Sequence, residues 1–200
     1  MKQAFQRSIV VIMSLEQRDI IPRGGSFFAH LFENPSVGLE RELYWNFTLD
    51  FEPLHYLDQE WGISAAVEWI RLAKSQSPLD NVVEMSARMQ PNAETSFYLA
   101  EHWPSDEWRL NVEPANGHRS WKADFAFVVD FAGLDDDPVP NLKLKGSVAI
   151  GFAGFIVIPE NLSPKPGTVE EAAELLSQYV TLDSSFSCTD ETWRYVFNRR

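Results

Sequence analysis

An alternation of apolar and polar residues with a period of two, repeated along the chain, constrains the fold more than any other feature of this sequence. It begins between residues 44 and 51, where Trp45, Phe47, Leu49 and Phe51 alternate with polar neighbours. Because successive side chains of a strand point to opposite faces of a sheet, the pattern predicts a strand with one face in the core and one in water. The same period recurs in four later segments: Val83-Met85-Ala87-Met89, Trp108-Leu110-Val112, Phe125-Phe127-Val129-Phe131 and Trp193-Tyr195-Phe197.

Short turn segments separate these predicted strands. They are rich in Pro, Asn, Asp and Gly: Gln90-Pro91-Asn92, Pro104-Ser105-Asp106, Pro114-Ala115-Asn116-Gly117 and Asp135-Asp136-Asp137-Pro138. Connections this short join antiparallel neighbours, so we expect an antiparallel meander of about five to seven strands. One further long strand is predicted over residues 143–158, with a bulge or bend at Gly151 and Gly154.

Two segments carry the period of a helix instead. Over residues 59–75, apolar side chains stand at i, i+3, i+4 and i+7: Ile63, Ala66, Val67, Ile70 and Ala73, with Asp58 placed to cap the start. Over residues 169–180, Thr168 and Glu171 have the spacing of a capping box, and the predicted buried face is Ala172, Leu175, Leu176 and Tyr179. The expected fold class is therefore α+β, with two helices and the first packed on one face of the meander.

Length and cysteine content limit the class of protein. Two hundred residues favour a single domain over residues 1–200, and 44% hydrophobic residues suffice for a core. The lone Cys188 cannot form an intramolecular disulfide, which favours a reducing compartment. The apolar run at residues 9–13 is too short for a secretory signal and fits a strand, and the run at residues 148–158 is too short to span a bilayer. The sequence thus predicts a cytoplasmic protein.

The net charge of −12 limits the partners. Residues 44–116 hold twelve acidic and four basic residues, whereas residues 1–43 are neutral. Nucleic acids and anionic membranes are polyanions, so neither is an expected partner, whereas a basic protein is.

No sequence motif for catalysis, metal binding or cofactor binding stands out. Arg23-Gly24-Gly25-Ser26 lacks the lysine and the spacing of a phosphate-binding loop, so a plain loop is predicted there. The four histidines lie at least sixteen residues apart, and Cys188 has no neighbouring base that would activate it. We therefore expect no cofactor, no metal and no catalytic residue.

Acidic and aromatic residues are interleaved in the middle of the chain. Two groups flank the predicted elements there and form the predicted partner-binding residues: Asp50, Glu52, Asp58 and Glu60, and then Glu101, Trp103, Asp106 and Glu107. Aromatic side chains supply desolvated anchors in protein interfaces, and charges steer the partner. The pattern favours a non-catalytic protein-binding domain, such as an acidic inhibitor or immunity-type protein that neutralises a basic toxin.

Two alternatives stay open at this point. A small-molecule-binding or hydrolytic domain would have a pocket between the sheet and helix 59–75, with His55 or His102 as the titrating group. A structural or assembly subunit would expose an edge strand, for which residues 191–198 are the candidate.

Overall fold

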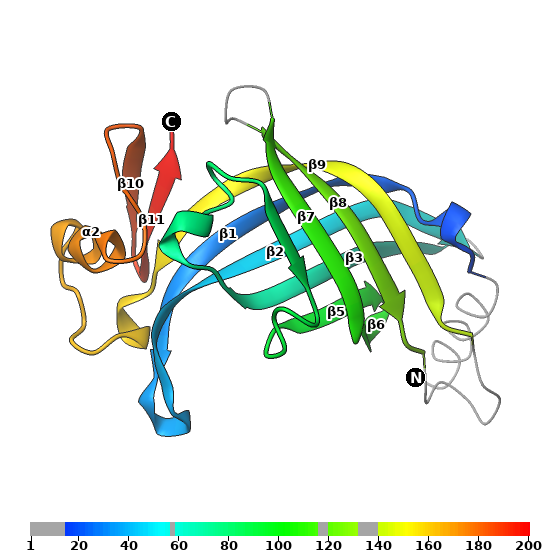
Figure 1. Ribbon diagram of the computed structural model, residues 1–200, viewed down its shortest axis with the longest axis horizontal. Helices are drawn as coiled ribbons and strands as arrows, with labels where there is room; N and C mark the ends of the chain where they lie inside the picture. The colour runs from blue at the N-terminus through cyan, green and yellow to red at the C-terminus, as the bar shows by residue number, and fades with distance from the viewer. Residues whose placement is uncertain (1–14, 57–58, 116–119, 132–139) are drawn as a thin grey trace.

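The computed structural model describes residues 15–56, 59–115, 120–131 and 140–200, and it is built almost entirely from strands. Eleven of them form one strongly curled sheet, with the order β4-β7-β8-β9-β1-β2-β3-β5-β6, while β10 and β11 form a hairpin that joins β9 through β11 (Figure 1). The bounds are β1 (Pro22–Asn34), β2 (Leu39–Tyr56), β3 (Gln59–Arg71), β4 (Val83–Ser86), β5 (Glu94–Leu99), β6 (Glu101–Pro104), β7 (Glu107–Ala115), β8 (Ser120–Val129), β9 (Leu142–Val157), α2 (Val169–Ser177), β10 (Phe186–Glu191) and β11 (Arg194–Arg199).

The sheet consists of two antiparallel halves joined by one parallel pair. Strands β1, β2, β3, β5 and β6 form the first half, and β4, β7, β8 and β9 form the second. The joint is the parallel pairing of β1 with β9, in which Ser26 opposes Gly151 and Leu31 opposes Val157. Strands more than a hundred residues apart in the chain therefore make the central seam of the molecule.

The curl places the buried faces of both halves against each other. Phe51 of β2 reaches Phe125 of β8 across the core, with ring centroids 5.8 Å apart, although two strands separate β2 from β8 in the sheet. Phe27 of β1 meets the edge of Trp121 at 5.0 Å. Aromatic pairs of this kind add to the area that their burial removes from water, so they fix how the sheet closes on itself.

Ser105 joins the two halves of the sheet at the corner between β6 and β7. It is 1% exposed, and its hydroxyl donates to the carbonyl of Val128 at 3.0 Å, while its own carbonyl accepts a hydrogen bond from the Thr95 hydroxyl. The amide of Asp130 donates to the carbonyl of Pro104 at 3.0 Å. These contacts tie β5 and β6 of one half to β8 of the other.

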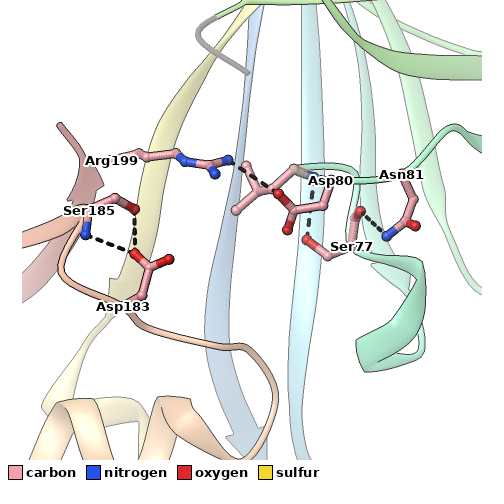
Figure 2. A network of polar contacts seen from close by, with 7 residues as sticks. Ser77, Asp80, Asn81, Asp183, Ser185 and Arg199 are labelled. Carbon is pink, nitrogen blue, oxygen red and sulfur yellow. Dashed lines mark hydrogen bonds and ion pairs between the residues drawn. The ribbon is translucent and has the colours of Figure 1, made fainter. Parts of the chain in front are cut away.

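A polar network fastens the C-terminal hairpin to the loop after β3 (Figure 2). Arg199 of β11 reaches Asp80 at 3.5 Å, and Asn81 donates to the carbonyl of Ser77 at 3.0 Å. On the hairpin side, Asp183 accepts from both the amide and the hydroxyl of Ser185, at 2.8 and 2.5 Å. The hydrogen bonds from Ser185 lower the pKa of the exposed Asp183 carboxyl.

The prediction of an α+β fold with two helices is wrong. In the described residues there is one α-helix, α2, and the sheet is larger than predicted and mixed. The predicted helix at residues 59–75 is strand β3, in which Ile63, Ala65 and Val67 are buried alternately. A bulge at Trp69, where φ is +64°, then lets Ile70 return to the core. Because of the bulge, the buried residues Val67 and Ile70 are three positions apart instead of two, which is a spacing typical of a helix.

The predicted loop at residues 23–26 is also wrong, because these residues belong to β1. Gly25 is required there by close packing, since a Cβ would collide with the carbonyl oxygen of Thr48 and lie 2.9 Å from Cγ2 of Ile150. The absence of a side chain lets β1 fit between β2 and β9.

The other predicted elements are confirmed with altered ends. Strands occupy residues 44–51, 108–112 and 125–129, and β9 follows the predicted 143–158 with a bend at Gly154, where φ is +109°. The predicted strand at 83–89 ends at Ser86, and Trp193 lies in the turn before β11. Helix α2 starts as predicted, with the Thr168 hydroxyl accepting from the amide of Glu171 at 3.2 Å. The strand predicted at 9–13 lies outside the described residues.

Candidate binding surface

Five aromatic rings gather on the outer face of β1, β2 and β3, opposite the core. We call them the aromatic patch: Phe28, His30, Phe32, Tyr44 and Trp69. His30 is at its centre, with ring centroids 5.1 Å from Trp69, 5.7 Å from Phe32, 6.0 Å from Tyr44 and 6.3 Å from Phe28. The rings share one face because Phe28, His30 and Phe32 alternate with the buried Phe27, Ala29 and Leu31.

Asn46 organises the patch from beneath. It is 3% exposed, and both the oxygen and the nitrogen of its amide group are hydrogen-bonded. The oxygen accepts from the backbone amide of Trp69 at 3.3 Å, and the nitrogen donates to the carbonyl of Tyr44 and to Nδ1 of His30, both at 3.1 Å. The bulge at Trp69 turns its backbone amide toward Asn46, so this single side chain couples the bulge to the histidine.

The bonds of Asn46 define the state of His30. Because the Asn46 nitrogen can only donate, Nδ1 of His30 accepts, and the proton of the neutral ring lies on Nε2. Burial among the rings lowers the pKa of His30, since the charged form would lose hydration. The imidazole is therefore a neutral member of the patch at pH 7.

Arg71 closes one side of the patch. Its guanidinium donates to the Tyr44 hydroxyl at 3.0 Å and lies 5.3 Å above the centroid of the Tyr44 ring. Phe28, His30, Phe32 and Trp69 all remain partly exposed. Trp, Tyr and Arg are the residues most enriched among those that dominate the affinity of protein interfaces. The composition and partial exposure of this surface are typical of a protein-binding site.

Acidic residues surround the patch on the same half of the sheet. Strands β2, β3, β5 and β6 carry eight acidic and two basic residues, whereas β7, β8 and β9 carry three acidic and four basic residues. Seven of the eight form what we call the acidic face: Glu40, Glu42, Asp50, Glu52, Glu60, Glu68 and Glu94. The eighth, Glu101, pairs with buried Leu99 and so lies on the other side of the sheet. The sheet is thus electrically uneven, with its excess of carboxylates on the half that holds the aromatic patch.

Glu68 and Glu94 are the most informative acidic pair. They stand directly opposite each other on β3 and β5, and Glu68 precedes Trp69 of the patch. Neither side chain makes an ion pair or a hydrogen bond within the described residues. Like charges in directly opposed positions destabilise a sheet, and a bound cation would relieve their repulsion.

The structure brings some of the predicted partner-binding residues to this half and separates others from it. Asp50, Glu52 and Glu60 are exposed on β2 and β3, and Glu101 is exposed on β6. Asp58 lies outside the described residues.

Three predicted residues at the β6–β7 corner have other surroundings. Trp103 is a packing residue, since its ring meets Phe131 at 5.4 Å and its indole donates to the carbonyl of Leu99 at 3.2 Å. Asp106 and Glu107 lead into β7 and line a groove on the second half of the sheet.

The groups considered for chemistry are dispersed. His55 is exposed opposite Glu60, and His102 is exposed with its ring 5.2 Å from that of Tyr98, so neither is a buried titrating group. The described residues contain no cluster of three metal-ligating side chains. Burial raises the pKa of the Cys188 thiol, which opposes formation of the reactive thiolate.

The fold alters the structural basis of both alternative functions, the pocket beside helix 59–75 and the exposed edge strand at residues 191–198. The pocket beside helix 59–75 is lost, because residues 59–71 are a strand whose buried side faces a filled core. Strand β11 lies between β9 and β10, so the edge of this part of the sheet is β10.

Comparison with known protein families, with curated proteins and with solved structures yields no match to this chain. Within the described residues, no helix has the length and apolar character that crossing a bilayer requires.

Proposed function

We propose that this chain is a non-catalytic binding protein that captures a basic protein partner on the acidic face, with the aromatic patch as the apolar anchor. The observation that carries the proposal is the coincidence of the two features on adjacent strands of one half-sheet. Charges speed and orient the encounter, and partly exposed rings supply the contact area that holds a complex together. An inhibitor or immunity-type role, in which the partner is a basic toxin, is the biological form that we propose for this binding.

The Glu68–Glu94 pair supports the choice of a basic partner. A lysine or arginine between the two carboxylates would neutralise a repulsion that the free protein has to sustain. The same guanidinium or ammonium would lie beside Trp69, whose ring face attracts cations. Arg71 already shows this geometry over Tyr44 within the chain.

The proposal is tested by titrating a decalysine peptide into the protein at low ionic strength and measuring the dissociation constant by calorimetry. The double variant Glu68→Gln/Glu94→Gln should weaken binding by about fivefold to thirtyfold, since a charge contact at the surface is worth roughly 0.5–1 kcal/mol. Raising the salt concentration should weaken the wild-type complex, because exposed charges are screened within about 10 Å at 0.1 M.

A matched control separates a site from the effect of net charge. Glu170→Gln/Glu174→Gln on α2 removes the same two charges from exposed positions elsewhere. If both double variants weaken decalysine binding equally, the peptide responds to overall charge and the proposed site is refuted.

A further inference from the structure

Four basic side chains that make no ion pair or side-chain hydrogen bond within the described residues surround a groove on the second half of the sheet. The groove has a volume of about 560 Å³ and is lined by residues of β7, β8 and β9, together with the turn after β4. Its basic side chains are exposed, whereas Ala126 and Val128 are half-buried. Its basic residues are Arg88, Arg109, Lys143 and Lys145. It lies on different strands from the aromatic patch and the acidic face, so it is independent of the function proposed above.

The lack of partners for these four side chains is unusual in this chain. The described residues include fourteen lysines and arginines, and eight of them make an ion pair or a side-chain hydrogen bond. Four of the remaining six lie around this one groove. In a protein with a net negative charge, this cluster of basic side chains makes the electrostatic potential locally positive, which would attract an anionic ligand.

The strand register defines the shape of the groove. Arg109 on β7 and Lys145 on β9 flank Ala126 on β8, in one row across the sheet. Adjacent strands are about 4.8 Å apart, so the two backbones stand roughly 10 Å apart with a methyl group between them. In the next row Glu107 and Lys143 flank Val128 in the same way. Two long cationic side chains therefore rise beside a low apolar floor.

This arrangement discriminates among ligands. A compact anionic head is attracted to the Arg109–Lys145 row, which carries two positive charges and no acidic residue. In the next row Glu107 offsets the charge of Lys143, and Asp106 lies beyond it, so that end of the groove offers no net positive charge to a second anionic group. The floor of Ala126 and Val128 favours an apolar body, and the volume is that of a small-molecule site.

We propose that the groove binds a small amphiphilic anion, with its carboxylate or sulfonate between Arg109 and Lys145 and its apolar body over Ala126 and Val128. The probe is 8-anilinonaphthalene-1-sulfonate, whose fluorescence rises when the ring system leaves water. The neutral analogue N-phenyl-1-naphthylamine has the same rings without the sulfonate. The proposal predicts saturable 1:1 binding of the sulfonate, at least tenfold tighter than binding of the neutral analogue.

Three variants locate the site. Arg109→Gln/Lys145→Gln should weaken sulfonate binding at least tenfold while leaving the neutral probe unchanged. Ala126→Leu fills the floor and should weaken both probes. Arg23→Gln is the control, because Arg23 is another exposed cation without an ion pair in the described residues but lies on β1, outside the groove, and binding should stay within twofold of wild type.

Melting curves of each variant show whether it is folded, so a loss of binding by misfolding is distinguishable from a loss of the site. Equal sulfonate affinity in wild type and Arg109→Gln/Lys145→Gln would overturn the proposal, as would non-saturable binding. A hexaglutamate peptide that depends on Arg109 and Lys145, when the sulfonate does not, would assign the groove to an acidic polypeptide instead and also overturn it. None of these results bears on decalysine binding by the acidic face.

Discussion

Replacing Gly25 with alanine should destabilise the protein more than any other single methyl addition among its strand glycines that have a negative φ. The Cβ would overlap the backbone carbonyl of Thr48 and approach the Ile150 side chain to 2.9 Å and the Leu49 Cα to 3.3 Å. Two of these three neighbours are backbone, so relief requires β1 to move away from β2. We expect a loss of about 3 kcal/mol, the upper end for overpacked positions, because β1 is the seam between the two halves.

Urea unfolding followed by tryptophan fluorescence measures this effect. For a chain of this size a slope of about 2–3 kcal/mol per molar urea converts the loss into a midpoint lowered by roughly 1 M. Gly62→Ala is the matched control, since nothing lies within 4 Å of its added methyl group, and it should be neutral or slightly stabilising. A Gly25→Ala midpoint equal to that of Gly62→Ala would refute the placement of β1 between β2 and β9.

Three further predictions concern single side chains. Burial lowers the pKa of His30 below its ordinary value of about 6.5, so at mildly acidic pH the unfolded chain binds a proton more readily than the folded one. The free energy of unfolding should therefore fall as the pH drops below 6.5. Urea titrations of wild type and His30→Phe at pH 7 and pH 5 measure this, and the variant should show a smaller dependence on pH. Among the described residues the buried indole nitrogen of Trp121 has no hydrogen-bond partner. Trp121→Phe should therefore cost no more than about 1 kcal/mol by urea unfolding, because removing an unsatisfied donor offsets the lost volume. Thr168→Ala should cost about 1 kcal/mol through loss of the α2 cap, whereas Thr189→Ala at an exposed position of β10 should stay within about 0.5 kcal/mol. A loss from Thr168→Ala no larger than that from Thr189→Ala would contradict the assigned cap.

The strands that alternate regularly could be predicted, because their pattern depends only on which face is buried. Phe125 and Phe127 on β8, or Leu110 and Val112 on β7, are read correctly without knowledge of their partners. Strand β3 could not be predicted from alternation, because the bulge at Trp69 changes the spacing of the buried residues within the strand. Whether a strand has a bulge there depends on Asn46, which belongs to another strand.

The parallel pairing of β1 with β9 has no local signal either. Gly24 and Gly25 have the composition of a loop, and the reason for Gly25 is the close approach of Thr48 and Ile150 from two distant segments. The available sign was a glycine beside an apolar segment, because glycine in a strand often marks a position where another backbone approaches closely.

The acidic character of the candidate site could be predicted from the sequence, but its aromatic patch could not. The acidic excess of residues 44–116 is a property of composition, and most of it falls on four neighbouring strands of one half-sheet. The aromatic patch draws Phe28, Tyr44 and Trp69 from three strands, so it exists only once their register is known. The alternation of Phe28, His30 and Phe32 with Phe27, Ala29 and Leu31 was the available signal, but a run apolar on both faces does not by itself say which face is outside.

The most direct measurement for the proposed function is amide chemical-shift mapping of the isotope-labelled protein during titration with decalysine. We expect the largest shifts to cluster on β2, β3 and β5, around Glu68, Trp69 and Glu94, and to disappear in Glu68→Gln/Glu94→Gln. Shifts centred on β7, β8 and β9, or distributed evenly over all exposed carboxylates, would contradict a basic partner docking on this half of the sheet.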